Sequence, residues 1–296
     1  QKQAVRISSA VTTADVPEDK PLAAFQGVHG AYSEIALERF FGDTVTGKPC
    51  RSFSDVFAAV MSGEALCGII PVENSLAGTI NDNFDLLLRH PDLTVIGEQQ
   101  IRITHNLIGF REATPETITD VFSHPQGLAQ CAEFLDSYPN MQRNPFFDTA
   151  GAVAHVAREG NHAYAAIAGR KTAEYYGLEI LKEGIETNPR NYTRFYIIAR
   201  EETRGMISGS VTPNRSVMVF STPDSPGALF TCLKVLADYG LNMKKLESRP
   251  IHGKPWEYMF FVETEIPDID THTKAVSELR KVSETFTHMG FFHSDR

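Results

Sequence analysis

Short apolar runs alternate with segments of helical spacing from residue 22 to about residue 176, and this alternation is the feature that most constrains the fold. The first repeat predicts a strand at Leu22–Phe25, a tight turn at Gly27–Gly30 and a helix over Tyr32–Phe41. Strands that alternate with helices of about ten residues are typical of βαβ units, so the pattern predicts an α/β fold with mostly parallel sheets.

The same pattern predicts two series of further elements. The first series comprises helices over 55–61 and 82–89, a strand at 67–72 and an extended segment at 94–103. The second comprises strands at 106–110, 120–123, 145–147 and 163–168, with helices over 125–136, 149–158 and 170–176. Because segment 94–103 separates them, we expect two lobes joined by crossing strands. Lobe one would comprise about 21–100 and 187–200, and lobe two about 101–186.

The order of elements changes in the C-terminal third. Residues 201–214 are rich in Gly, Ser, Thr and Pro and are the best linker candidate. Residues 215–296 then predict strands at 216–221, 243–249, 256–263 and 287–292 and helices over 227–239 and 270–282, which is the ferredoxin-like βαββαβ order. Residues 1–20 lack periodicity and are expected to form a flexible tail.

Composition narrows the classes of partner. The net charge of −9 argues against nucleic acid or an anionic membrane surface as a main partner, because both require a concentrated positive field. The four cysteines have no metal-ligand spacing and indicate neither a metal site nor a disulfide framework. Together with the absence of a long apolar run or a signal-peptide pattern, this predicts a cytoplasmic protein. Gln1 is not a natural start, so a trimmed leader is left open.

Several strand-to-helix junctions end in a hydroxyl or an amide, at Ser33, Asn74–Ser75, Ser123 and Thr149. For any one of them helix capping is the more probable explanation. Their repetition favours a second interpretation, because helix N-termini beyond the carboxyl ends of parallel strands bind anions. Four such junctions facing one cleft would bind a small di-anion without a large basic patch.

Thr193, Arg194 and Phe195 open a strand rich in β-branched and aromatic residues. A hydroxyl, a permanent cation and an aromatic face suit a small anionic substrate with a ring, although such a triplet often arises by chance. Glu73 follows an apolar strand and is interpreted either as a general acid or base or as a structural hydrogen-bond partner, the second being favoured.

Eight short motifs occur in the order found in the prephenate dehydratases and the related arogenate dehydratases. They are Gly27-x-x-Gly30-Ala-Tyr-Ser-Glu34, Pro71-Val-Glu-Asn-Ser75, Asp85-Leu-Leu-Leu-Arg-His90, Ser123-His-Pro-Gln126, Asp148-Thr-Ala150, Thr193-Arg-Phe195, Gly227-Ala-Leu-Phe230 and Glu247-Ser-Arg-Pro250. The last two are similar to the effector motifs of an ACT regulatory domain. The chain therefore resembles this family from about residue 22 to its end.

The resemblance implies a two-lobed catalytic domain like that of a periplasmic binding protein, followed by an ACT domain. It also implies conversion of prephenate to phenylpyruvate, water and carbon dioxide in L-phenylalanine biosynthesis, without a metal or other cofactor. L-Phenylalanine would be the allosteric effector, and ACT domains would pair in a homodimer or homotetramer. Whether arogenate replaces prephenate as the substrate is left open, as is a non-catalytic sensor of amino acids or aromatic acids.

The resemblance also implies roles for individual residues. Thr193 would be the catalytic residue, hydrogen-bonding the departing hydroxyl, with the proton coming from water or through Glu73. Substrate would be bound by Ser33, Glu73, Asn74, Ser75, Thr79, Ser123, Thr149, Arg194 and Phe195. The effector would be bound by Gly227, Ala228, Leu229, Asn242, Glu247, Ser248, Arg249 and Pro250.

Overall fold

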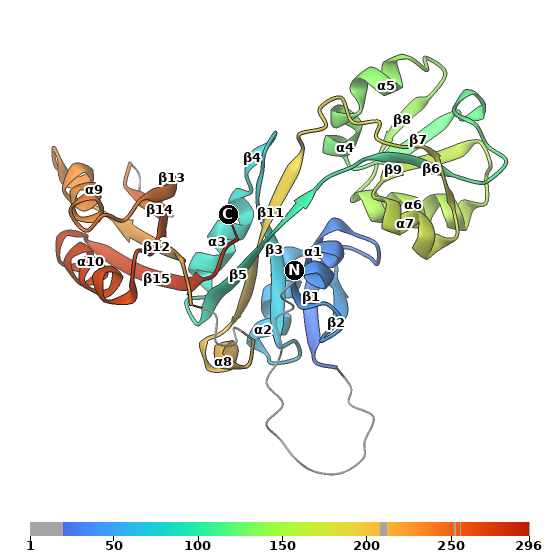
Figure 1. The fold of residues 1–296 in the computed structure, drawn as a ribbon. Helices are drawn as coiled ribbons and strands as arrows, with labels where there is room; N and C mark the ends of the chain where they lie inside the picture. The colour runs from blue at the N-terminus through green and yellow to red at the C-terminus, as the bar shows by residue number, and fades with distance from the viewer. Residues whose placement is uncertain (1–19, 208–211, 252, 255, 296) are drawn as a thin grey trace, which may run out of the picture. The chain divides into compact units, whose positions relative to one another are not determined.

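The computed structural model describes residues 20–207, 212–251, 253–254 and 256–295 (Figure 1). The predicted N-terminal tail therefore falls almost entirely outside the described residues. Internal contacts divide the described chain into two units. The first contains residues 20–86 and 99–196, and the second contains residues 87–98 and 197–295.

Lobe one is built on a sheet with the strand order β2-β1-β3-β11-β5, with β4 paired to β3. Its strands are β1 (Leu22–Gln26), β2 (Thr46–Cys50), β3 (Cys67–Asn74), β4 (Gly78–Thr79), β5 (Leu93–Arg102) and β11 (Tyr192–Arg200). Its helices are α1 (Tyr32–Phe41), α2 (Phe53–Met61) and α3 (Asn81–Arg89). Strand β1 runs parallel to both β2 and β3. The prediction that the strand after residue 192 returns to this lobe is confirmed. The short strand β2 was not predicted.

Lobe two is built on a separate five-stranded sheet of order β10-β6-β9-β7-β8. Its strands are β6 (Asn106–Gly109), β7 (Asp120–Ser123), β8 (Gln142–Pro145), β9 (Tyr164–Ala168) and β10 (Glu179–Lys182). Its helices are α4 (Pro125–Gln130), α5 (Ala132–Asp136), α6 (Thr149–Glu159) and α7 (Arg170–Tyr176), with a 3₁₀ turn, η1, at Pro115–Thr117. The helix predicted over 125–136 is thus two helices that meet at Cys131.

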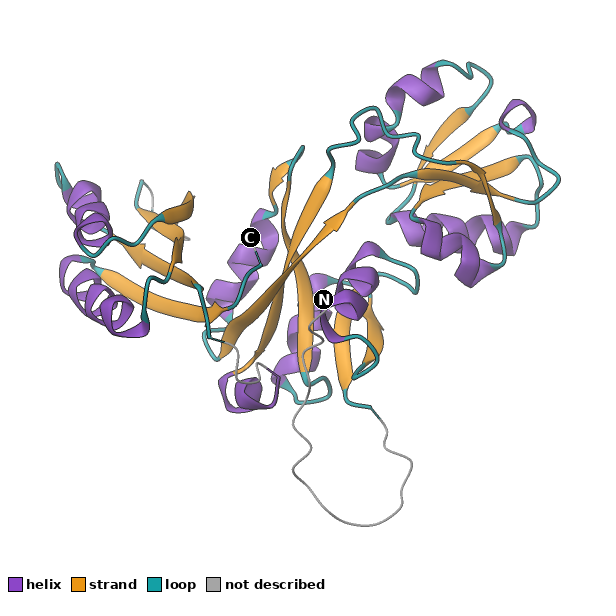
Figure 2. Ribbon diagram, viewed as in Figure 1, coloured by secondary structure: helices purple, strands orange, loops and turns teal. Residues whose placement is uncertain are grey.

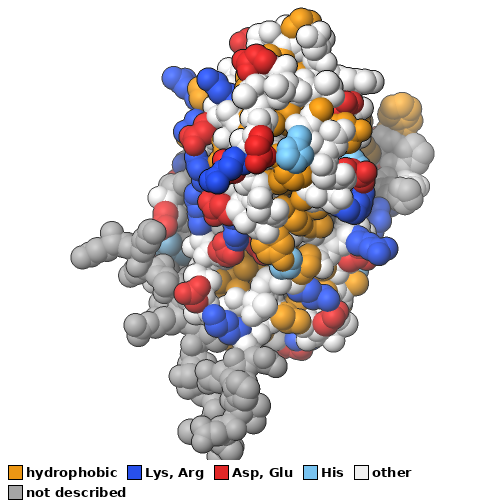
Figure 3. Space-filling model, turned by 90° about the vertical axis from the view of Figure 1, so that its right-hand side faces the viewer, with side chains coloured by type: hydrophobic (Ala, Val, Ile, Leu, Met, Phe, Trp, Pro, Cys, Tyr) orange, Lys and Arg blue, Asp and Glu red, His pale blue; other side chains and the backbone are white. Residues whose placement is uncertain are grey.

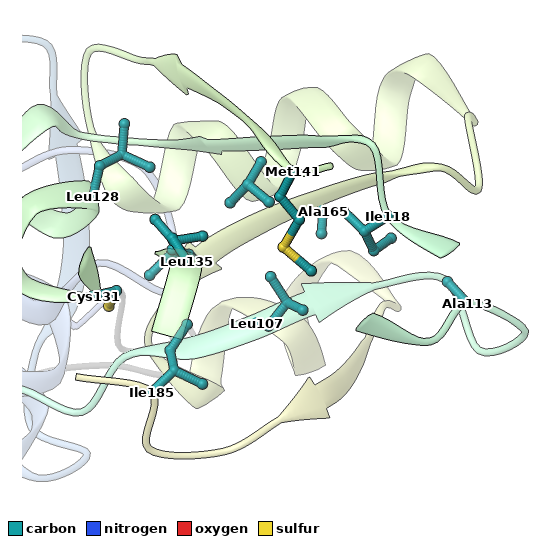
Figure 4. Packing of buried hydrophobic residues seen from close by; sticks show 11 residues of the cluster. Leu107, Ala113, Ile118, Leu128, Cys131, Leu135, Met141, Ala165 and Ile185 are labelled. Atoms are coloured by element: carbon teal, nitrogen blue, oxygen red, sulfur yellow. The ribbon is translucent and has the colours of Figure 1, made fainter. Parts of the chain in front are cut away.

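The sheet of lobe two is mixed, whereas mostly parallel sheets were expected. Strand β7 is parallel to β8 and β9, but β6 is antiparallel to β9 and β10 is antiparallel to β6. Helices cover both faces of this sheet (Figure 2). Each face has its own buried cluster, and Figure 4 shows the one formed by Leu107, Ile118, Leu135, Met141, Ile185 and their neighbours. Two covered faces explain why several of its strands are apolar throughout.

The C-terminal part has the predicted ferredoxin-like order, with a four-stranded antiparallel sheet of order β13-β14-β12-β15. Its strands are β12 (Arg215–Ser221), β13 (Met243–Pro250), β14 (Tyr258–Glu265) and β15 (Thr285–Phe292), and its helices are α9 (Ala228–Asp238) and α10 (Ile269–Val282). The predicted linker begins as a 3₁₀ turn, η2 (Glu201–Thr203), followed by a short helix, α8 (Arg204–Ile207), so its first half is helical. Residues 208–211 of that linker lie outside the described residues.

Two histidines lie together in this C-terminal part. The rings of His272 on α10 and His288 on β15 are 5.6 Å apart between centroids, and His288 Nε2 lies 2.9 Å from Ser216 Oγ. Burial lowers the pKa of His272, and burial together with His272, Arg204 and Arg280 lowers the pKa of His288 to about 4. Both rings are therefore neutral at pH 7.

We expect the free energy of unfolding of this C-terminal part to fall on mild acidification. The pKa of His288 is near 6.5 when unfolded and about 4 when folded, so the unfolded chain binds more protons between these values and stability drops as pH falls. From pH 7 to pH 5 the loss from this residue is about 2 kcal/mol. Hydrogen exchange of the β12 and β15 amides at the two pH values measures it. In His288→Gln the pH dependence should shrink, and an unchanged dependence would assign it to other groups.

Candidate functional site

The residues around Thr193 are placed by the alternation of side chains along β11. Successive side chains of a strand point to opposite faces of its sheet, so Thr193 and Phe195 share one face while Arg194 and Tyr196 share the other. The guanidinium of Arg194 accordingly lies 5.3 Å from the ring centroid of Tyr196. The hydroxyl, cation and ring that the sequence places in a row therefore do not face one common pocket.

On the Thr193 face, three polar side chains are joined by hydrogen bonds. Asn74 Nδ2 donates to Thr193 Oγ1 at 3.0 Å and to Asn191 Oδ1 at 2.8 Å. Asn74 lies at the end of β3 and Asn191 just before β11, and all three residues are buried. Ser75 ties the same strand ends together, because it donates from Oγ to Arg190 O and accepts from Tyr192 N. The predicted neighbours Asn74, Ser75 and Thr193 are thus brought together.

On the opposite face, Glu73 forms an ion pair with Arg194. Glu73 Oε2 and Arg194 Nη2 are 3.0 Å apart, and the Arg194 side chain is 7% exposed. Neighbouring β4 places Thr79 directly opposite Glu73 in the β3–β4 register. Arg194 is therefore already paired with a protein carboxylate, and Glu73 lies on the other face of the sheet from Thr193. This geometry favours the structural interpretation of Glu73 over a proton relay to Thr193.

Two residues predicted to contact the substrate are buried. Phe195 is 2% exposed, and every residue of β11 from Thr193 to Ala199 is buried, so both faces of the strand are covered. Ser123 is fully buried and donates from Oγ to Ile167 O at 2.7 Å. Both side chains are buried in this structure, and their contacts with substrate stay predictions.

The other two junctions lie at helix starts. Ser33 is in the first turn of α1 and mostly buried, and Thr149 is the half-buried first residue of α6. Asp148 caps α6 by accepting from Gly151 N, and burial raises the pKa of this carboxyl. Burial would also raise the pKa of Glu34, but hydrogen bonds from Gly30 N and His29 lower it overall. Asp148 thus caps α6 as the simpler interpretation expects, whereas the residue that precedes α1, Ala31, makes no side-chain cap.

Two of the cavities in the described part have volumes of about 300 and 340 Å³, and Thr193 lines neither of these two. The larger is lined by residues of both lobes, among them Tyr32, Arg102, Thr104 and Arg170. The choice of Thr193 as the candidate catalytic residue therefore depends on the hydrogen bonds around it and not on a cavity. No group of three or more His, Cys, Asp or Glu in the described chain is placed to hold a metal ion.

The surface agrees with the charge balance of the sequence. On the face shown in Figure 3, Lys and Arg side chains are interspersed with Asp and Glu. Such a face lacks the concentrated positive field that a phosphate backbone requires. Among the helices that the structure describes, none combines the length and apolar character needed to cross a membrane.

The predicted effector residues all lie in the C-terminal part. Gly227 precedes α9 with φ of 80°, which places the first turn of that helix at Ala228 and Leu229. The segment Glu247–Pro250 ends β13, the edge strand of the sheet. Asn242 donates from Nδ2 to Glu265 Oε2 at 2.9 Å.

Two polar residues of the Thr193 surroundings were not predicted, namely Gln130 and His105. Asn191 immediately precedes the strand, and the segment Thr104–Asn106 is a polar interruption between two apolar strands. That interruption could have indicated His105 as a candidate site residue. No sequence pattern indicated Gln130, because its hydrogen-bond partners are distant in the sequence.

Comparison with known proteins identifies the family. The model of "Prephenate dehydratase" matches residues 23–203, and the model of "ACT domain" matches residues 216–281. The bifunctional chorismate mutase/prephenate dehydratase of Escherichia coli (strain K12) is 35% identical over 277 residues, covering 92% of this chain and 70% of the relative. Arogenate dehydratase 3, chloroplastic, of Arabidopsis thaliana is 37% identical over 288 residues, covering 92% and 67%.

Solved structures agree with that result. The prephenate dehydratase of Arthrobacter aurescens in complex with L-Phe has a TM-score of 0.81 at 27% identity, covering 92% of this chain and 90% of that one. GqqA, described as a novel type of quorum quenching acylase, also has a TM-score of 0.81, at 32% identity, covering 93% and 98%. The family model spans most of the described catalytic part, and the chain belongs to the prephenate dehydratase family.

Proposed function

We propose that this chain is a prephenate dehydratase, which converts prephenate to phenylpyruvate, water and carbon dioxide. The observation that carries the proposal is the Thr193 hydroxyl. Its oxygen accepts from Asn74 Nδ2, which leaves its own hydrogen to donate to another acceptor. A hydrogen bond from Thr193 to the ring hydroxyl of prephenate would assist the departure of that group.

The proposed reaction needs little from the protein beyond orientation. The bond between the ring and its carboxylate breaks, and its electron pair forms the last ring double bond as the carbon–oxygen bond to the hydroxyl breaks. The leaving oxygen takes one proton to become water. A threonine hydroxyl is a weak acid, so Thr193 orients and stabilises the leaving group while water supplies the proton. All of these steps proceed through chemistry that side chains and solvent provide.

The test is turnover of prephenate and arogenate in parallel by the purified chain. We expect phenylpyruvate, detected by its ultraviolet absorbance, with a higher kcat/KM on prephenate. A higher kcat/KM on arogenate would assign the chain to the arogenate dehydratases, and binding without turnover would make it a sensor. An acylase activity is not favoured, because Thr193 receives its hydrogen bond from an amide, which cannot act as the base that activates a nucleophile.

We further propose that L-phenylalanine binds the ACT domain at the start of α9 and the end of β13, and that two ACT domains pair through β13. The L-Phe complex of the related Arthrobacter enzyme supports the ligand. The position of β13 at the sheet edge supports pairing, because an edge strand has unpaired backbone groups. All four cysteines, each in the described part, are buried and free, which supports a reducing compartment such as the cytoplasm.

Substitution of Ser248 with valine is expected to weaken L-phenylalanine binding by at least about tenfold, or 1.4 kcal/mol, without unfolding the domain. Ser248 is exposed on β13, and exposed substitutions usually change stability by less than about 0.5 kcal/mol. Titration calorimetry on the full chain measures the affinity, and sedimentation measures the oligomer. Lys234→Ala on the exposed side of α9 is the control. Equal affinity in both variants would place the effector elsewhere.

A further inference from the structure

A line of hydrogen bonds, partly buried at Gln130, continues from the Thr193 site into lobe two. Asn191 Nδ2 donates to Gln130 Oε1 at 3.0 Å, and His105 Nε2 lies 2.8 Å from the same oxygen. Gln130 is the last residue of α4, and His105 lies in the segment that crosses from β5 to β6. His105 is 2% exposed, so this imidazole has no access to solvent that would replace Gln130 as its partner.

The direction of every bond in this line follows from backbone groups. Asn74 Oδ1 accepts from the N–H groups of Leu76 and Ala77, so Asn74 Nδ2 must face Thr193 and Asn191. An amide nitrogen can only donate, which makes the facing atom of Asn191 its oxygen and turns Asn191 Nδ2 toward Gln130. Gln130 must then present its oxygen.

The same reasoning fixes the tautomer of His105. Since Gln130 presents Oε1 to both neighbours, His105 must carry its hydrogen on Nε2 and donate it. Its Nδ1 lies 3.4 Å from the hydroxyl of Tyr32, whose own hydrogen goes to Thr104 O at 2.6 Å. The backbone N–H of His105 is held by Glu186 Oε2 at 3.0 Å. Burial lowers the pKa of His105, in keeping with a neutral ring.

We propose that His105 is a positioning residue for the dehydratase reaction. Its Nε2–H holds the Gln130 amide in one orientation, and Gln130 holds Asn191. Asn191 Oδ1 in turn accepts from Asn74 Nδ2, which also donates to the Thr193 hydroxyl and leaves the hydrogen of that hydroxyl available to the leaving group. This inference rests on the proposed function. His105 does not touch the substrate. Without its ring, Gln130 is free to rotate, so Asn191 Nδ2 loses a fixed acceptor and Asn191 no longer holds its oxygen on Asn74 Nδ2. Asn74 stays anchored by the N–H groups of Leu76 and Ala77, but its nitrogen then holds the Thr193 hydroxyl less firmly.

The kinetic test compares His105→Leu with His105→Gln. Misplacing a catalytic group by about 1 Å costs as much as 10²-fold, so we expect His105→Leu to lower kcat on prephenate by about 10- to 100-fold while KM changes little. Glutamine keeps an N–H donor near the position of Nε2, and His105→Gln should recover most of the lost rate. Adding Thr193→Ala to His105→Leu should lower kcat no further than Thr193→Ala alone, because both act through one hydroxyl.

A readout without substrate accompanies this test. The ¹⁵N NMR shifts of the two ring nitrogens report the tautomer of His105. In the wild type at neutral pH, we expect these shifts to show the hydrogen on Nε2. In Asn191→Asp the new carboxylate only accepts, so Gln130 turns its nitrogen toward it, and the hydrogen of His105 moves to Nδ1. A wild-type ring protonated on Nδ1, or a tautomer that Asn191→Asp leaves unchanged, overturns the proposal even if a His105 variant fails to fold.

The kinetic outcomes separate this inference from the function on which it rests. If the wild-type chain turns over neither prephenate nor arogenate, the proposed function fails. If the wild type is active and His105→Leu has wild-type kcat, only the positioning role fails. Equal losses in His105→Leu and His105→Gln, or losses that add to that of Thr193→Ala, would give His105 a purely structural role and overturn the proposal.

Discussion

Replacing Thr193 with alanine is expected to lower kcat on prephenate by about 10² to 10³, the usual cost of removing one hydrogen bond aimed at the charge that develops in a transition state. KM should change much less, because the hydroxyl acts chiefly on the bond that breaks. Thr193 is held by Asn74 at 3.0 Å and is 9% exposed, so its hydroxyl is fixed in direction but still borders the surface. Steady-state kinetics on the purified variant measure both constants.

Two further variants of Thr193 complete this test: serine is the control for the hydroxyl, and valine gives the result that could contradict the prediction. Thr193→Ser keeps the hydroxyl and should retain kcat to within about tenfold of the wild type, since the loss is confined to a methyl group and its orientation. Thr193→Val keeps the shape without the hydroxyl and should resemble alanine. A valine variant with near wild-type kcat would remove Thr193 from the reaction and would leave the family relationship unexplained at its central residue.

Replacing Gly290 with alanine is expected to destabilise the unit that contains the ACT domain by about 3 kcal/mol or more. Gly290 lies on β15 with φ of 134°, a backbone conformation that side chains rarely adopt. A Cβ there would meet Val95 O of β5 at 2.2 Å and Thr94 Oγ1 at 2.6 Å. Thr94 Oγ1 also donates to Met289 O at 3.2 Å, so the Thr94 side chain ties β5 to the backbone of β15.

The matched control is Gly240→Ala. Gly240 follows α9 with φ of 68°, and a Cβ there would meet no described atom within 4 Å. Alanine at this position costs about 1 kcal/mol of backbone strain without any collision. Thermal unfolding of the full chain, together with hydrogen exchange of the β15 amides, compares the two variants. Equal stabilities would mean that β15 moves away from β5 at little cost.

The sequence predicted the elements well where one local pattern decided the structure. Helices α1 and α7 and strand β7 match their predicted bounds, because helical spacing or apolar runs marked them. The break between α4 and α5 was missed, since the apolar spacing continues across Cys131. Strand β2 was missed because its sequence, Thr-Gly-Lys-Pro-Cys, has low strand propensity, and its pairing with β1 decides its structure.

For the candidate site, the sequence indicated several residues that lie together but not the face of the sheet toward which each side chain points. Thr193, Asn74 and Ser75 do meet, as the repeated junctions suggested. The strand containing Thr193 was predicted, but the alternation that puts Arg194 on the face opposite Thr193 and Phe195 was not considered. The connection from Asn191 through Gln130 to His105 joins residues 61 and 25 positions apart, and no local pattern reports such pairs.

The position of β11 in the first sheet has a consequence for biosynthesis. Strand β11 lies between β3 and β5, although more than a hundred residues separate it from β3 in the chain. During translation β3 and β5 therefore emerge with open edges, which are closed only when residues 192–200 arrive after the whole of lobe two. A nascent chain halted before Tyr192 would expose two apolar strands to other chains. Lobe one, although encoded first, is therefore completed only after lobe two.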